Sequence, residues 1–161
     1  MRFARAVSVA ALAMAVVGCE KKPEAAAPAA PILIGHVASM TGEQATFGES
    51  TDNAIKLAIN EQNAKGGVKG RMLAVKTYDD QGKPEEAAIA ATRLIVNDKV
   101  LVLLGEVASS RSLAIAPIAD QNKVPQISPT STNPRVTKDG DKTRPYVFRV
   151  CFIDPFQGTV M

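Results

Sequence analysis

Short apolar segments alternate with helix-like segments along the chain from Ile32 to Val150, and this alternation restricts the fold more than any other feature. A helix that connects two strands usually carries the chain back to the edge where the first strand began, so the two strands are parallel. Right-handed connections wind such units into a doubly wound sheet. We therefore predict an α/β fold with a mainly parallel sheet in the likeliest order 2-1-3-4-5, whose strands span 32–37, 71–78, 100–104, 124–128 and 146–150.

Three helices are predicted between these strands. The first covers 50–63, where Ser50 or Thr51 can cap the N-terminus. The second begins at Pro84, which suits a first helical turn, and the third covers 113–121. Apolar residues of the second helix recur on one helical face; they are Ala87, Ala90, Ala91, Leu94 and Ile95.

The loops that follow strands one, three and four are rich in glycine and in hydroxyl side chains; they span 39–48, 105–110 and 128–134. Neighbouring parallel strands end at the same edge of a sheet, so these loops are expected to converge on one crevice. Ser109 and Ser110 are placed to open a helix, whose unpaired N–H groups suit a carboxylate, although capping alone would explain both serines. We predict a site for a small polar ligand.

The N-terminus has the layout of an export signal, predicted over residues 1–18. Arg2 and Arg5 precede an apolar run over 6–17. At about 1.5 Å per residue this run is too short for the ~30 Å core of a membrane. We therefore expect a signal peptide and not a permanent membrane helix.

Small residues before Cys19 resemble the bacterial lipobox, in which the cysteine is acylated and begins the mature protein. The alternative is an ordinary signal peptide with an incidental cysteine. Residues 19–31 are polar and rich in proline and alanine, and they lack the large apolar side chains that would favour a packed structure. This segment is predicted to be a tether from a lipid anchor on the outer side of a bacterial membrane, in the periplasm or at the cell surface.

Charge and cysteine content exclude several partners. Loss of Arg2 and Arg5 with the signal peptide lowers the formal net charge by two, from +3 to +1, so no basic patch suggests nucleic acid or an anionic membrane surface. If Cys19 is lipidated, Cys151 is the only other thiol, and no internal disulfide is expected. Without a histidine nearby, Cys151 is interpreted as a buried small hydrophobe and not as a reactive thiol.

No catalytic or metal-binding set of residues stands out. His36 is the sole histidine and lies within the first strand, which favours a packed structural role over a catalytic triad or a ligand cluster. Asp79 and Asp80 could form a carboxylate pair, but a turn explains them better. Residues 66–70 lack the pattern of a phosphate-binding loop and indicate a helix stop and a turn. We predict a binding protein with no cofactor and no metal, and not an enzyme.

Several segments, taken in order, resemble the leucine/isoleucine/valine-binding proteins of ABC importers, which have the type I periplasmic binding fold. The similarity runs from about Ile32 to Gly158, and its pieces have high specificity only together. They are Ile34-Gly35, Met40-Thr41-Gly42, Phe47-Gly48, residues 63–70, Tyr78-Asp79-Asp80, Leu104-Gly105, Ser109-Ser110 and residues 127–132.

The resemblance implies a ligand site. By position, Ser109 would donate its hydroxyl and N–H to an amino acid's carboxylate, and the backbone around Ala108 and Thr130 would add contacts. Thr132 would bind the ammonium or the carboxylate, and Phe47 would form an apolar side wall. These residues recognise the part common to all amino acids, so the side-chain preference stays open.

Members of the family also have a second lobe, which closes over the ligand and supplies an acidic residue. Residues 32–150 are predicted to be the N-terminal lobe, and residues 151–161 to begin the crossover to a second lobe that this chain lacks. We therefore expect weak binding and exposed apolar surface.

The first functional hypothesis is a lipid-anchored binding protein that delivers an amino acid, branched-chain by preference, to the membrane subunits of an ABC importer. A sensory domain for small amides or carboxylates is the alternative among binding modules. A flavodoxin-like hydrolase or transferase, or a purely structural lipoprotein, remains as an alternative from another class.

Overall fold

The computed structural model describes residues 29–161, and within them five parallel strands form one sheet. The α/β class and the strand order 2-1-3-4-5 are confirmed, with β7 as the fifth strand. The predicted signal peptide and Cys19 lie outside the described residues. The strands are β1 (Ile32–Ala38), β2 (Leu73–Asp79), β3 (Val102–Leu104), β4 (Gln126–Ser128) and β7 (Val147–Arg149), in the order β2-β1-β3-β4-β7.

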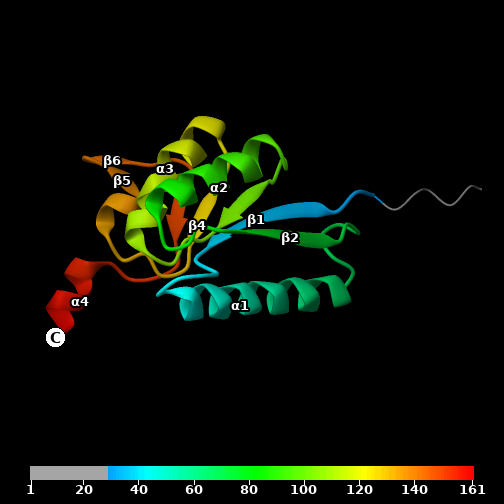
Figure 1. Ribbon diagram of the computed structural model, residues 1–161, viewed down its shortest axis with the longest axis horizontal. Coiled ribbons are helices and arrows are strands. Elements are labelled where there is room, and N and C mark those ends of the chain that lie inside the picture. The colour runs from blue at the N-terminus through cyan, green and yellow to red at the C-terminus, as the bar shows by residue number, and fades with distance from the viewer. Residues whose placement is uncertain (1–28) are drawn as a thin grey trace, which may run out of the picture.

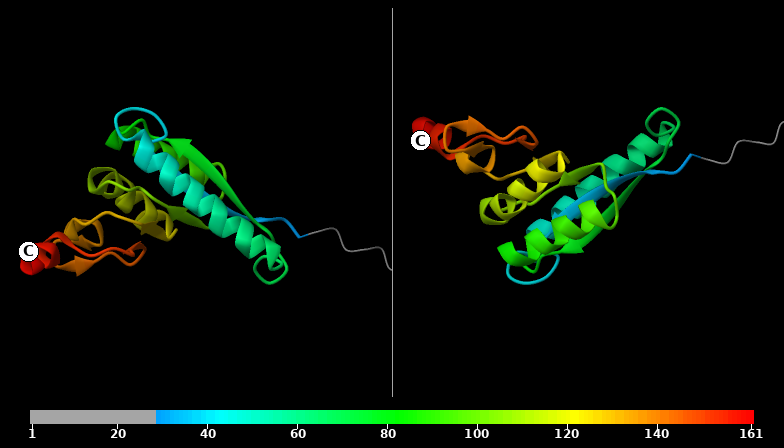
Figure 2. Two further views of the ribbon diagram at one scale, coloured as in Figure 1. Left: turned by 90° about the horizontal axis from the view of Figure 1, so that it is seen from below. Right: turned by 90° about the horizontal axis from the view of Figure 1, so that it is seen from above.

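Helices cover the two faces of this sheet unequally. α2 (Pro84–Val96) and α3 (Ser109–Asn122) pack side by side on one face, whereas α1 (Ala45–Ala64) lies on the other (Figure 1). Seen from its own side, α1 runs along β1 and β2 (Figure 2). Parallel sheets normally have both faces covered by helices. Within residues 29–161, β3, β4 and β7 have a helical cover on one face only.

The main hydrophobic core lies between the sheet and α2. Leu94 of α2 is fully buried and shares this core with Val37 of β1 and Leu103 of β3. Burying one leucine in this way stabilises a fold by about 1.5–3 kcal/mol. The helical face predicted from the sequence is buried in full, and it comprises Ala87, Ala90, Ala91, Leu94 and Ile95.

The first helix begins earlier than the sequence predicts. α1 starts at Ala45, and neither Ser50 nor Thr51 caps it, because both lie inside the helix. The early start depends on Gly48: a Cβ atom at this position would lie 2.0 Å from the carbonyl oxygen of Ser39. The N-terminal turns of α1 therefore rest directly on the loop after β1.

The other differences concern short or exposed segments. α3 begins at Ser109, as predicted from the placement of Ser109 and Ser110, and thus four residues before the range 113–121. A 3-10 turn (Pro134–Val136), the hairpin of β5 (Lys138–Asp139) and β6 (Lys142–Thr143), and α4 (Asp154–Val160) were not predicted, because elements this short carry little hydrophobic periodicity. No helix within residues 29–161 is both long and apolar enough to cross a bilayer.

A buried polar link joins β1, β2 and α1. His36 of β1 is fully buried, and its Nδ1 lies 3.2 Å from Oδ1 of Asp52 on α1. The same oxygen accepts a hydrogen bond from the Thr77 hydroxyl on β2 at 2.7 Å. Burial lowers the pKa of His36, and the hydrogen bond and charge of Asp52 offset this effect only in part. His36 is thus packed inside the fold, as predicted.

Lowering the pH is expected to destabilise the fold through His36, the sole histidine of the chain. The unfolded chain takes up a proton near the ordinary pKa of 6.5, whereas the folded state resists protonation. The stability that His36 contributes is therefore complete above this value and is lost as the pH falls toward the lower folded pKa. Urea denaturation between about pH 5 and 8 measures the slope.

The variant His36→Gln is the control for this slope. It is expected to lower the urea midpoint of unfolding at neutral pH, because glutamine does not fill the buried site of the imidazole ring. It is also expected to flatten the dependence of stability on pH. An equal dependence of stability on pH in the wild type and the variant would contradict the assignment of this dependence to His36.

Candidate ligand site at the carboxyl edge of the sheet

A crevice of about 380 Å³ opens where the loops after β1, β3 and β4 meet. Three of the five ligand-site residues predicted from the sequence line it, namely Phe47, Ala108 and Thr130. They come together because neighbouring parallel strands end at the same edge of the sheet. The complete lining is Gln44, Phe47, Ser50, Thr51, Val107, Ala108 and Thr130.

Ser109 and Thr132 do not line this crevice. Ser109 is the first residue of α3 and follows Ala108, and its Oγ accepts a hydrogen bond from the N–H of Asn133 at 3.2 Å. The hydroxyl of Ser109 keeps its own proton for donation. Thr132 is half-buried, and its carbonyl accepts a hydrogen bond from the N–H of Asp154 at 3.1 Å. Ser109 thus adjoins the crevice, whereas Thr132 lies farther along its loop.

Hydroxyl side chains of the converging loops bind other parts of the loops. Ser128 and Ser131 are buried, and their hydroxyls donate to the carbonyl oxygen of Glu106 at 2.7 and 3.1 Å. Thr130 donates its hydroxyl to the carbonyl of Val107 at 2.7 Å. These bonds hold the loops after β3 and β4 together. Several donors that the sequence suggested for a ligand therefore build the wall of the crevice.

A buried charged cluster lies behind the crevice, formed by Asp80, Glu106 and Arg111, each at most 4% exposed. The Nε of Arg111 donates to Oε2 of Glu106 at 2.8 Å and lies 3.7 Å from Oδ2 of Asp80. Burial raises the pKa of Asp80, and the negative charge of Glu106 adds to this effect. The N–H of Ala108 donates to Oε2 of Glu106 at 2.7 Å, so this expected donor is already used inside the protein.

Sequence reasoning missed this cluster because each of its members, taken alone, is typical of a solvated surface. The available signal was an acidic residue, Glu106, within the loop 105–110 already assigned to the site, and a basic residue, Arg111, directly after that loop.

Asp79 is the last residue of β2, one position before the predicted turn, and Asp80 leads into that turn; both side chains accept hydrogen bonds from its backbone. Oδ1 of Asp79 accepts hydrogen bonds from the N–H of Met40 at 2.9 Å and of Gln81 at 2.8 Å. Burial alone would raise the pKa of Asp79, but hydrogen bonds outweigh it and hold this pKa below its ordinary value. The side chain thereby ties the loop after β1 to the turn after β2.

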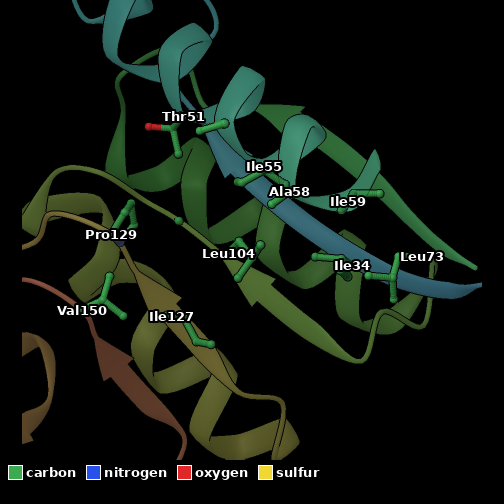
Figure 3. A pocket seen from close by; sticks show the side chains of 12 residues that line it. Ile34, Thr51, Ile55, Ala58, Ile59, Leu73, Leu104, Ile127, Pro129 and Val150 are labelled. Carbon is green, nitrogen blue, oxygen red and sulfur yellow. The ribbon is translucent and has the colours of Figure 1, made fainter. Parts of the chain in front are cut away.

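A second cavity, of about 420 Å³, lies between α1 and the uncovered part of the sheet (Figure 3). We call it the apolar trough. Thr51 is the one polar side chain in its lining, whereas the crevice also has Gln44, Ser50 and Thr130 and adjoins the start of α3. We therefore place the candidate site for a polar ligand in the crevice. The trough is lined by Ile34, Thr51, Ala54, Ile55, Ala58, Ile59, Leu73, Leu104, Gly105, Ile127, Pro129 and Val150.

Reactive side chains are scarce in the described part of the chain. Within residues 29–161, no group of three histidine, cysteine or acidic side chains is arranged to hold a metal ion. Cys151 is a free thiol and is half-buried, so the predicted full burial is wrong.

Comparisons with known proteins give a consistent assignment. Residues 31–160 match the family model described as "Periplasmic binding protein". The leucine-specific-binding protein of Salmonella typhimurium is 35% identical over 127 residues, which are 79% of this chain and 33% of that protein.

Two crystal structures agree in fold. The leucine-binding protein LivK of Thermotoga maritima is 45% identical with a TM-score of 0.73, over 81% of this chain and 35% of that one. LivJ of Streptococcus pneumoniae, in complex with isoleucine, is 32% identical with a TM-score of 0.72, over 77% and 34%. The chain spans about a third of the length of these relatives. It belongs to the periplasmic binding proteins, within the branched-chain amino-acid-binding family of type I fold, as its sequence motifs predicted.

Proposed function

We propose that this lobe binds an amino acid, branched-chain by preference, in the crevice and serves an ABC importer. One observation supports this most: Phe47, Ala108 and Thr130 come together at the carboxyl edge of the sheet, beside the first turn of α3. The relatives named above bind leucine or isoleucine according to their own descriptions.

The ligand's carboxylate is proposed to lie at the start of α3. The first N–H groups of a helix lack an acceptor within the helix, and they carry partial positive charge. Ser109 adds its hydroxyl proton as a further donor. Because the N–H of Ala108 and the hydroxyl of Thr130 are used internally, these two residues contribute shape and carbonyl groups instead of donors.

The apolar part of the ligand is proposed to pack on Phe47, whose side chain is 64% exposed at the crevice. An aliphatic side chain gains about 25 cal/mol for each Å² of apolar surface that leaves water. Thr132 does not line the crevice. Within this lobe the ammonium group is therefore proposed to face carbonyl groups of the crevice wall, and a second lobe of family size would complete its neutralisation. No bond is made or broken in this function, which requires only capture and release.

Ser109→Ala is expected to weaken the affinity for L-leucine about tenfold or more, because a hydrogen bond to a charged group contributes about 1.5–3 kcal/mol. Thermal-shift measurements on the purified chain with single amino acids identify the ligand class, and calorimetry gives the affinity. The neighbouring and exposed Ser110→Ala is the matched control and should change little. A folded protein that responds to no aliphatic amino acid would contradict the proposal.

The lobe is proposed to work together with a second lobe, with residues 151–161 as the start of the crossover. The apolar trough supports this proposal. Its walls include Leu104 and Ile127, from strands with a helical cover on one face only, and Val150, just after β7. A ligand held from one side keeps much of its surface in water, so this lobe alone is expected to bind weakly.

Without a cover, the trough is expected to drive concentration-dependent association. Val150→Lys should reduce this association, because a charge at its 76% exposed side chain opposes burial. Leu57→Lys, on α1 and 60% exposed but not in the lining of the trough, is the matched control. Sedimentation velocity at several concentrations measures both variants. A wild-type chain that stays monomeric at every concentration would show that the trough does not drive association.

We also propose that residues 1–18 are removed, that Cys19 carries the lipid, and that residues 19–31 tether the lobe to a bacterial membrane. The extracytoplasmic setting of periplasmic binding proteins is consistent with this anchor. Cys19→Ala in the full precursor should move the protein from the membrane to the soluble fraction and remove the acyl mass. A protein that stays at the membrane by the same amount after this substitution would refute the anchor.

A further inference from the structure

The geometry points to Arg111 as a positioning residue of the crevice: its one buried guanidinium joins three separate segments, two of which line the crevice. The inference rests on the proposed function for its ligand, but it is carried by contacts that exist without one. Arg111 itself does not line the crevice.

The guanidinium of Arg111 contacts each of these segments. Its Nε donates to the carboxylate of Glu106, in the loop after β3, at 2.8 Å. Its Nη1 donates to the carbonyl of Gly82, in the turn after β2, at 3.3 Å. Its Nη2 donates to Oε1 of Gln44, the residue just before α1. Gln44 lines the crevice, so one side chain of α3 fixes the opposite wall.

Glu106 extends this arrangement to two further backbone positions. Its Oε2 accepts the N–H of Ala108 at 2.7 Å, and its Oε1 accepts the N–H of Ser39 at 3.3 Å. Ala108 lines the crevice. The ion pair of Arg111 and Glu106 therefore links Gln44, just before α1, to the loop after β3, and both segments line the crevice.

The cost of this arrangement argues for a role beyond stability. Glu106 is fully buried, Arg111 is 4% exposed, and Asp80 brings a second buried carboxylate near the same guanidinium. Buried ion pairs usually stabilise a fold no better than apolar side chains of similar volume, because desolvation offsets the attraction. Their advantage is direction: a planar guanidinium holds several acceptors in fixed positions, which the flexible ammonium of lysine does not.

Arg111→Lys is therefore the informative substitution, because it keeps the positive charge and removes the planar guanidinium with its several donors. Arg144→Lys is the matched control. Arg144 is also partly buried, and its Nη1 donates to Asp120 at 3.0 Å, near the other end of α3. Each variant loses a guanidinium from an ion pair that involves a residue of α3, Arg111 in one case and Asp120 in the other, but only the pair of Arg111 adjoins the crevice.

The first measurement is amide hydrogen exchange of the purified chain, which needs no ligand. In Arg111→Lys, exchange is expected to rise about tenfold or more in residues 39–45, 80–83 and 106–108, and to stay unchanged in β1 and α2. Arg144→Lys should leave these three segments unchanged. A rise of equal size in β1 and α2 would show a merely structural role, and no rise in the three segments would also overturn the inference.

The second measurement tests the consequence for L-leucine by calorimetry. Arg111→Lys is expected to weaken the affinity about tenfold. The reason is that binding must then order the crevice walls, since Arg111 makes no direct contact with the ligand. Gln44→Ala should weaken binding in the wild type and add little in Arg111→Lys, because the two residues act as one unit. Full additivity would argue against the coupling. If the wild type does not bind leucine, the proposed function fails, whereas the amide hydrogen exchange measurement still decides the role of Arg111.

Discussion

The packing of α2 against the centre of the parallel sheet fixes the position of every functional loop. Leu94 holds β1 and β3 together from one side through the core that it shares with Val37 and Leu103. Because these strands are parallel and adjacent, their carboxyl ends meet at one edge, and the loops that follow them form the crevice. The position of the candidate ligand site is therefore a consequence of strand order, and its detailed shape is set by the hydrogen bonds that hold the loops to each other.

Much of this framework was predictable, because it depends on hydrophobic periodicity. The alanine-rich face of α2 follows from its helical periodicity. The strand order follows from the alternation of strands and helices together with right-handed connections. The start of α1 was not predictable in this way. It depends on Gly48, which fits against the carbonyl of Ser39, and this contact lies between segments whose separation the sequence does not reveal.

The site was predicted in outline and not in its hydrogen bonds. Phe47, Ala108 and Thr130 meet as the family resemblance implied, but the resemblance could not show which donors are already used. Thr130 gives its proton to Val107, and Ala108 gives its N–H to Glu106. A hydroxyl-rich loop has two uses for its donors, and only the three-dimensional arrangement distinguishes bonds that build a wall from bonds that await a ligand.

The two faces of the sheet separate two requirements of a binding lobe. The face under α2 and α3 is complete, and it supports the loops of the crevice. The face beside α1 leaves Leu104 and Ile127 in an apolar trough with no helical cover among residues 29–161. A ligand with charged ends is favoured in the crevice, where polar groups and a helix terminus compensate its desolvation, and it is disfavoured in the trough, where nothing does. The crevice and the trough therefore differ in kind: the first suits a small solute, and the second suits the apolar face of another polypeptide segment.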